Sequence, residues 1–168
     1  WNFEGGKTGR VLWPYEAIDI DSGGARARYW GGALYLDGLC LPRQVAVTAN
    51  QEWRPALLED RPSVLARGVR IRATQDGKAA DVTMQGFPRT TEVADRRARM
   101  RGYGLIGETV EVQSDAAFHQ DGLLWVTLTL RPARDASSGR DQRRKEATID
   151  SLAVEIPWRA ANARSLVA

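Results

Sequence analysis

The sequence predicts an all-β fold, a two-sheet antiparallel β-sandwich with long loops and little helix. Three observations support this prediction. Apolar and polar residues alternate with a period of two in several short segments. Turn pairs such as Asp76-Gly77 and Asp121-Gly122 separate these segments. No segment carries the 3.6-residue apolar stripe of a long helix. A closed barrel is the alternative arrangement of the same strands.

The first half of the chain contains three short predicted strands, at 25–30, 33–36 and 44–49. One short helical turn is expected between 53 and 60. A clearer hairpin follows around Asp76-Gly77, a pair that tolerates the positive φ angles of a tight turn. Its strands alternate, with six residues expected to face inward: Val69, Ile71 and Ala73 on the first strand, and Ala80, Val82 and Met84 on the second.

The second half begins with 92–100, which permits a helix but lacks an apolar face. Segments 110–113 and 124–131 alternate, and we expect them to pair antiparallel through a loop at 114–122. Alanine is the only apolar residue type in 133–146, so this stretch is predicted to be a solvated loop. A last strand at 149–156 is expected to turn Leu152, Val154 and Ile156 toward the core.

Length and composition point to one globular domain. The chain has 168 residues, of which 43% are hydrophobic and 27% are charged, and single domains usually contain about 100–200 residues. We expect the sandwich to span 1–158 and 159–168 to be an exit segment toward a following domain. The first residue is Trp1, and the chain reads as a piece of a longer protein.

Composition also excludes several classes of protein. The single cysteine, Cys40, excludes an internal disulfide framework and a multi-cysteine zinc site. The single histidine, His119, excludes a histidine-rich metal centre. No apolar run approaches the roughly 18–20 residues of a membrane span, so no membrane partner is expected.

No catalytic residue and no cofactor are predicted. Gly6-Lys7-Thr8 resembles the end of a phosphate-binding loop, but the glycine required five positions earlier is replaced by Trp1. His119 has Ser114, Asp115 and Asp121 nearby in sequence, without the spacing of a known catalytic arrangement. We therefore expect an ordinary loop histidine.

Asp19 and Asp21 form the front of a calcium-loop pattern. The twelfth position of that pattern, where a bidentate Glu is needed, is occupied by Trp30. An EF-hand is therefore excluded. A simpler cation site at Asp19 and Asp21 is one interpretation, and an ordinary Asx turn without a metal is the other.

Six tryptophans provide the candidates for sugar stacking, because a flat aromatic ring stacks on a sugar as well as it fills a core. Trp53 and Trp125 are the two predicted carbohydrate-binding residues. Two arginine-rich runs, at 96–101 and 140–145, suggest a basic nucleic-acid or anion-binding domain instead. Glu92 and Asp95 adjoin the first run, Asp141 and Glu146 interrupt or adjoin the second, and the net charge is only +3, so nucleic acid is the disfavoured partner.

The stretch 25–42 contains a strand ending in Trp30-Gly31, an alternating aromatic strand and a Leu–x–Pro exit. It resembles the N-terminal β-sandwich of bacterial glycoside-hydrolase-like multidomain proteins related to glycoside hydrolase family 123. Further agreement comes from four segments: Leu12-Trp13-Pro14-Tyr15, Leu57-Leu58 before Pro62, Asp121-Gly122-Leu123, and the closing stretch Ile149–Pro157. Those relatives often have Arg directly after Trp-Gly, where this chain has Gly32.

The resemblance implies a non-catalytic sandwich that packs against a separate (β/α)8 catalytic domain of the same polypeptide and helps to shape its sugar site. It also implies a bacterial protein that acts outside the cytoplasm. The family's activity, substrate-assisted hydrolysis of β-linked N-acetylhexosamine, uses an adjacent Asp-Glu pair. This chain has only the reversed Glu59-Asp60, so no catalytic residue is transferred. A stand-alone carbohydrate-binding module is the alternative function.

Overall fold

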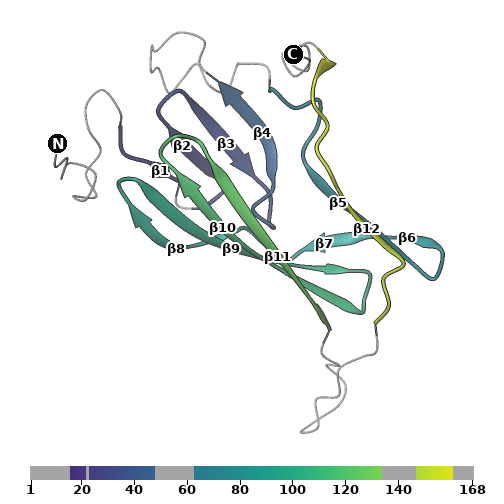
Figure 1. The fold of residues 1–168 in the computed structure, drawn as a ribbon. Coiled ribbons are helices and arrows are strands. Elements are labelled where there is room, and N and C mark those ends of the chain that lie inside the picture. The colour runs from purple at the N-terminus through teal and green to yellow at the C-terminus, as the bar shows by residue number, and fades with distance from the viewer. Residues whose placement is uncertain (1–15, 22, 48–62, 134–146, 161–168) are drawn as a thin grey trace, which may run out of the picture.

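The computed structural model describes residues 16–21, 23–47, 63–133 and 147–160, and its twelve named elements are all β-strands (Figure 1). Every pairing between them is antiparallel. The prediction of an all-β antiparallel fold is therefore confirmed.

One layer is a five-stranded sheet in the order β11-β10-β9-β7, with β8 also pairing with β9. Its long strands alternate strictly between buried and accessible residues, as expected for a sheet with one face on a core. The strands are β7 (Val82–Met84), β8 (Arg89–Ala94), β9 (Arg97–Ile106), β10 (Val110–His119) and β11 (Leu124–Pro132).

The opposite layer is divided into two smaller sheets. One has the order β1-β2-β3-β4, with β1 (Asp19–Ile20), β2 (Arg26–Tyr29), β3 (Gly32–Leu36) and β4 (Pro42–Val47). The other has the order β12-β5-β6, with β5 (Arg70–Gln75), β6 (Lys78–Ala80) and β12 (Ser151–Glu155).

Backbone hydrogen bonds join β4 to the segment that leads into β5. The Val64 N–H donates to the Val45 carbonyl at 2.8 Å, and the Val69 N–H donates to the Pro42 carbonyl at 2.8 Å. The segment that leads into β5 therefore runs antiparallel beside β4. The second layer is continuous at this point, although its strands belong to separate sheets.

The core lies between the two layers and has two parts. In the first, Met100, Ala116 and Phe118 of the five-stranded sheet pack against apolar residues of the four-stranded sheet, including Leu34 and Leu36. In the second part, the three-stranded sheet contributes Ile71 and Ala73, and the five-stranded sheet contributes Ile106, Val110 and Val112. The structure therefore has the two packed layers of the predicted sandwich, and one of these layers is divided into two sheets.

A tight turn at 37–41 lies where the two parts of the core meet. The buried Asp37 carboxylate accepts hydrogen bonds from the Leu39 and Leu41 N–H groups at 2.8 and 2.9 Å. Burial raises the pKa of Asp37, while these two hydrogen bonds act in the opposite direction. Cys40 in the same turn has φ of 59°, a conformation that a non-glycine residue rarely adopts.

The structure corrects three strand assignments from the sequence. Segment 92–100, considered helix-permissive, belongs to the β8–β9 hairpin. The expected loop at 114–122 is wrong, because β10 continues to His119 and only a short turn separates it from β11. The predicted return strand at 80–85 is also wrong as a single element. It breaks at Asp81 into β6 and β7, which belong to different sheets.

Burial corrects two further expectations. Met84 is exposed instead of facing inward, although the Asp76-Gly77 turn has the predicted positive φ angles of 51° and 70°. Leu152 and Val154 lie opposite the buried Ala73 and Ile71, as a core-facing strand requires. These two residues and Ile156 are nevertheless about half exposed, because β12 is an edge strand.

The contact between the 37–41 turn and β9 yields a stability prediction. A Cβ placed on Gly102 would lie 2.2 Å from the Gly38 carbonyl oxygen and 2.8 Å from the Leu39 Cα. We expect Gly102→Ala to lower the free energy of unfolding by about 2 kcal/mol or more, because backbone must move to admit the methyl group. Urea denaturation measures this change.

Gly23→Ala is the matched control, because a Cβ there meets no atom within 4 Å. Its free energy of unfolding should change by less than about 0.5 kcal/mol. Equal destabilisation by the two substitutions would contradict the role assigned to Gly102.

Candidate functional site

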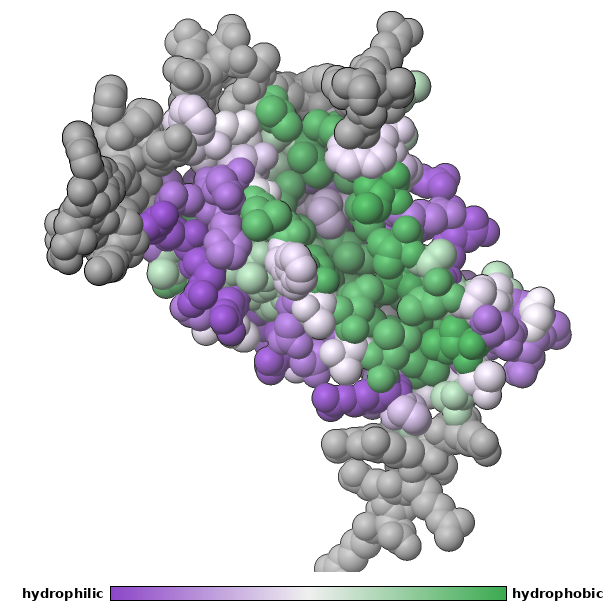
Figure 2. Space-filling view, in the orientation of Figure 1, coloured by the Kyte–Doolittle hydropathy of each residue, from purple (hydrophilic) through white to green (hydrophobic). Residues whose placement is uncertain are grey.

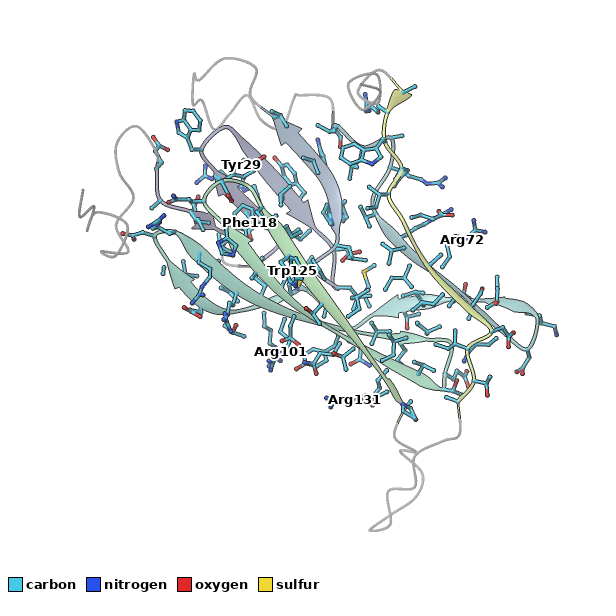
Figure 3. All side chains as sticks on the ribbon, in the orientation of Figure 1. Tyr29, Arg72, Arg101, Phe118, Trp125 and Arg131 are labelled. Carbon is cyan, nitrogen blue, oxygen red and sulfur yellow. The ribbon has the colours of Figure 1, made fainter. Side chains whose placement is uncertain are left out.

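The outer face of the five-stranded sheet presents an exposed aromatic residue among polar side chains. Trp125 on β11 is 66% exposed, and its cross-strand neighbour on β10 is Ala117, which is small. The indole therefore stands clear of its neighbours. Tyr103 on β9 is a second exposed ring on the same face of the sheet. Figure 3 labels Trp125 and, on β9, Arg101.

A hydrogen-bonded network lies between these rings. Arg101 Nε donates to Asp115 Oδ1 at 2.7 Å, and Gln113 Nε2 donates to Asp115 Oδ2 at 2.7 Å. The Arg101 guanidinium is the main reason that the pKa of Asp115 lies below its ordinary value. Asp115 is thus an ionised, partnered carboxylate, suited to accepting a hydrogen bond but not to acting as a general acid.

The register gives the spacing of the two rings. Trp125 and Arg99 both lie opposite Ala117, and Tyr103 is four residues beyond Arg99 on β9. With strands about 4.8 Å apart and a rise of about 3.3 Å per residue, the two positions are separated by about 16 Å diagonally. We call Trp125, Tyr103, Arg101, Asp115 and Gln113 the aromatic–polar platform.

A second accessible surface is apolar and lies on the opposite side of these strands. Four large side chains, Leu152, Val154, Ile156 and Trp158, are between 43% and 52% exposed. Across from them, β11 contributes the partly buried Val126, Leu128 and Leu130. Figure 2 shows hydrophobic residues gathered over β11, β12 and β5. We call these seven residues the β11–β12 apolar face.

The structure places Asp19 and Asp21 in separate local interactions. The Asp19 carboxylate pairs with the Arg28 guanidinium across β1 and β2. Asp21 Oδ1 accepts hydrogen bonds from the Ala25 N–H at 2.8 Å and the Arg26 N–H at 3.1 Å, which is an Asx-type turn. The cation site remains a prediction. Among the described residues, no three His, Cys, Asp or Glu side chains form a cluster that could hold a metal ion.

The remaining predicted sites fall partly outside the described residues. Trp53 and the arginine run at 140–145 lie outside them. In the other run, Arg97, Arg99 and Arg101 project from β9, where Glu92 pairs with the first two and Asp115 pairs with the third. This pairing neutralises much of the positive charge that a nucleic-acid backbone would need.

The candidate nucleophiles and bases are not arranged for catalysis in the described part of the chain. The His119 imidazole makes no hydrogen bond to any described residue, and its cross-strand neighbour is Arg97. Cys40 is fully buried, and burial raises the pKa of its thiol to about 11. A thiol that stays protonated at neutral pH is a poor nucleophile.

An arginine cluster on the outer side of the three-stranded sheet was missed by the sequence analysis. The Glu155 carboxylate is bonded by Arg67 at 3.1 Å, Arg70 at 2.7 Å and Arg72 at 2.8 Å. Beside it, Arg67 joins Arg43 and Arg159 around a cavity of about 300 Å³. Three of these arginines lie close together in 67–72, but Glu155, Arg43 and Arg159 come from distant segments, so no local sequence pattern could have identified the cluster.

Comparison with known proteins found no matching family model, no matching curated protein and no matching solved structure. In the described ranges, no helix has the length and apolar character needed to cross a membrane.

The arginine cluster yields a prediction about Glu155. Hydrogen bonds from Arg72 and Arg70 lower its pKa from 4.5 to about 2. Because the folded-state pKa is lowered, the carboxylate stabilises the β5–β12 contact above about pH 4.5, and this contribution is lost as the pH falls toward 2. A carboxyl-carbon NMR titration should give a midpoint near 2.

The Arg70→Ala/Arg72→Ala variant is the control for that titration. Removing both donors should return the Glu155 midpoint toward 4.5. A wild-type midpoint near 4.5 would contradict the prediction.

Proposed function

We propose that this chain is a non-catalytic β-sandwich domain of a glycoside-hydrolase-like protein, and that it packs against a (β/α)8 catalytic domain of the same polypeptide. The β11–β12 apolar face carries the proposal. Four large apolar side chains in succession, each about half exposed, make a continuous surface of the kind that marks a protein–protein interface.

Energetics support a docked partner. Fully burying a large apolar side chain stabilises by about 1.5–3 kcal/mol, so covering the exposed half of each residue gives roughly 1 kcal/mol per side chain. The occupant must be apolar, because the side chains of this face offer almost no hydrogen-bonding groups. The outer helices of a (β/α)8 barrel can present an apolar surface of this kind where their outward faces are buried against another domain.

The absence of an organised catalytic group among the described residues supports a non-catalytic role. Cys40 is buried, Asp115 and Glu155 are held by arginines, and the His119 imidazole has no hydrogen-bond partner among the residues that the structure describes. Catalysis then belongs to the other domain, as the resemblance to glycoside-hydrolase-like proteins implies. The sandwich would provide a rigid support and a further sugar-contacting surface.

Amide hydrogen exchange of the native polypeptide that contains this chain tests the proposal, after its intact mass has shown whether a second domain is present. In the whole polypeptide, the amides of β12 should exchange at least tenfold more slowly than in residues 1–168 alone, because docking excludes solvent and suppresses fraying of this edge strand. Val154→Asp should abolish that protection.

Val93→Asp is the matched control, because Val93 is an exposed valine on β8 of the other layer. It should leave the protection of β12 intact. Equal exchange of β12 in both forms, or a native mass equal to that of the isolated chain, would reject the docked domain.

A stand-alone carbohydrate-binding module is the second candidate, and the aromatic–polar platform favours it. Trp125 supplies a ring for stacking on a sugar, and the Arg101–Asp115–Gln113 network supplies donors and acceptors for hydroxyl groups. A polar network held between two exposed rings suits a glycan of several units.

Affinity gel electrophoresis on soluble β-linked glycans tests this candidate. Trp125→Ala should abolish retardation, because loss of the indole removes the stacking surface. Trp158→Ala removes an exposed tryptophan from the β11–β12 apolar face and should leave retardation unchanged. Equal effects of the two substitutions, or no retardation of the wild type, would reject the platform as a glycan site.

A further inference from the structure

The structure points to a binding site for a tetrahedral oxyanion in the cavity lined by Arg43, Arg67 and Arg159, which we propose as a site independent of the docking face. The cavity has a volume of about 300 Å³. It lies where β4, the segment that precedes β5 and the residue after Trp158 come together. Three arginines line it, and no acidic residue among the described ones does.

The backbone around the cavity is held in place by hydrogen bonds. The Val64 N–H donates to the Val45 carbonyl at 2.8 Å, and the Arg159 N–H donates to the Val64 carbonyl at 3.1 Å. Arg159 Nε also donates to the Leu65 carbonyl at 3.2 Å. Because this bond uses only one N–H of the guanidinium, the terminal N–H groups remain able to bind an anion.

Ser63 adds a neutral donor to the same cavity. Its Oγ accepts hydrogen bonds from the Val45 N–H at 3.2 Å and the Leu65 N–H at 3.1 Å. With both lone pairs engaged, the hydroxyl can act toward a further group only by donating its proton. A hydroxyl that can only donate is suited to a hydrogen bond with an oxygen that carries negative charge.

The surrounding charge favours an anion. Arg67 shares Glu155 with Arg70 and Arg72, so one carboxylate faces three guanidinium groups. Arg43 has no ion-pair partner among the described residues. Asp37 attracts it electrostatically, but the Asp37 carboxylate accepts its hydrogen bonds from two backbone N–H groups. An excess of positive charge therefore remains at this place.

The geometry indicates the class of ligand. Guanidinium groups pair with the oxygens of sulfate and phosphate through two parallel hydrogen bonds, which gives specificity as well as attraction. A cavity of about 300 Å³ accepts one such group and the residue that carries it. A sulfate ester of a sugar and a phosphate monoester share this chemistry, and we propose the tetrahedral oxyanion as the recognised element.

NMR titration of residues 1–168 with sodium sulfate and with sodium phosphate, each against sodium chloride at constant ionic strength, tests the site. Both oxyanions should shift the amide signals of Leu65 and Ala66 with saturation, and chloride should not. Sulfated dextran against neutral dextran then distinguishes the sources. Tighter binding of sulfated dextran than of inorganic sulfate supports a sulfated sugar, and tighter binding of inorganic phosphate supports a phosphate ligand.

Substitutions of the arginines test whether sulfate binds in the cavity. Arg43→Gln/Arg159→Gln should weaken sulfate binding at least tenfold, because two charged donors are lost. Arg89→Gln/Arg131→Gln removes two exposed arginines from the other layer and should leave the affinity unchanged. Glu155→Gln should strengthen binding severalfold, because it releases Arg67.

Three results would overturn the proposal. They are the absence of saturable shifts with either oxyanion, equal shifts with chloride, and equal weakening by both pairs of substitutions. The wild-type titration still tests the proposal if the Arg43→Gln/Arg159→Gln variant fails to fold. Loss of this site would leave the docking proposal untouched, because none of the seven residues of the β11–β12 apolar face lines the cavity.

Discussion

The architecture depends on the contact between the 37–41 turn and the small residues of the five-stranded sheet. The turn brings its backbone so close to β9 that Gly102 has no room for a side chain, and the Leu39 side chain of the turn lies against Gly104, which the Thr83 carbonyl also approaches. The Asp37 carboxylate, although raised in pKa by burial, satisfies two N–H groups of the turn that would otherwise be buried without partners. A costly buried charge thus maintains the conformation in which the two layers meet.

The same contact explains the open side of the sandwich. Leu39 and Leu41 belong to one part of the core and Cys40 to the other, so the turn joins both parts. Strand β4 begins directly after the turn, so the segment before β5 has no further residues of β4 to pair with beyond Pro42. The chain then continues as β5, which forms a separate sheet with β12. The apolar residues of β12 then lie at an edge instead of under the five-stranded sheet. The exposed apolar face is a consequence of the split layer.

Strands in which large apolar residues alternate are predictable from the sequence, whereas strands whose core positions hold small residues are not. Strand β11 was foreseen because Leu124, Val126, Leu128 and Leu130 mark one face. The second half of β10 and most of β9 were missed, because Ser114, Ala116, Gly102 and Gly104 occupy inward positions at the closest contacts. Among the sites, an outward Trp125 follows from the period-two pattern of its strand. The arginine cavity does not, because its three residues meet only through tertiary structure.

Strand geometry keeps the proposed surfaces independent. Successive side chains point to opposite faces, so Trp125 projects outward while Leu124 and Val126 point toward the core. On β12, Val154 lies on the apolar side and Glu155 turns to the arginines of the outer side. A domain covering the β11–β12 apolar face therefore leaves the aromatic–polar platform in solvent. The arginine cavity is lined by none of the seven residues of that face, so docking and ligand binding use different residues of one small sandwich.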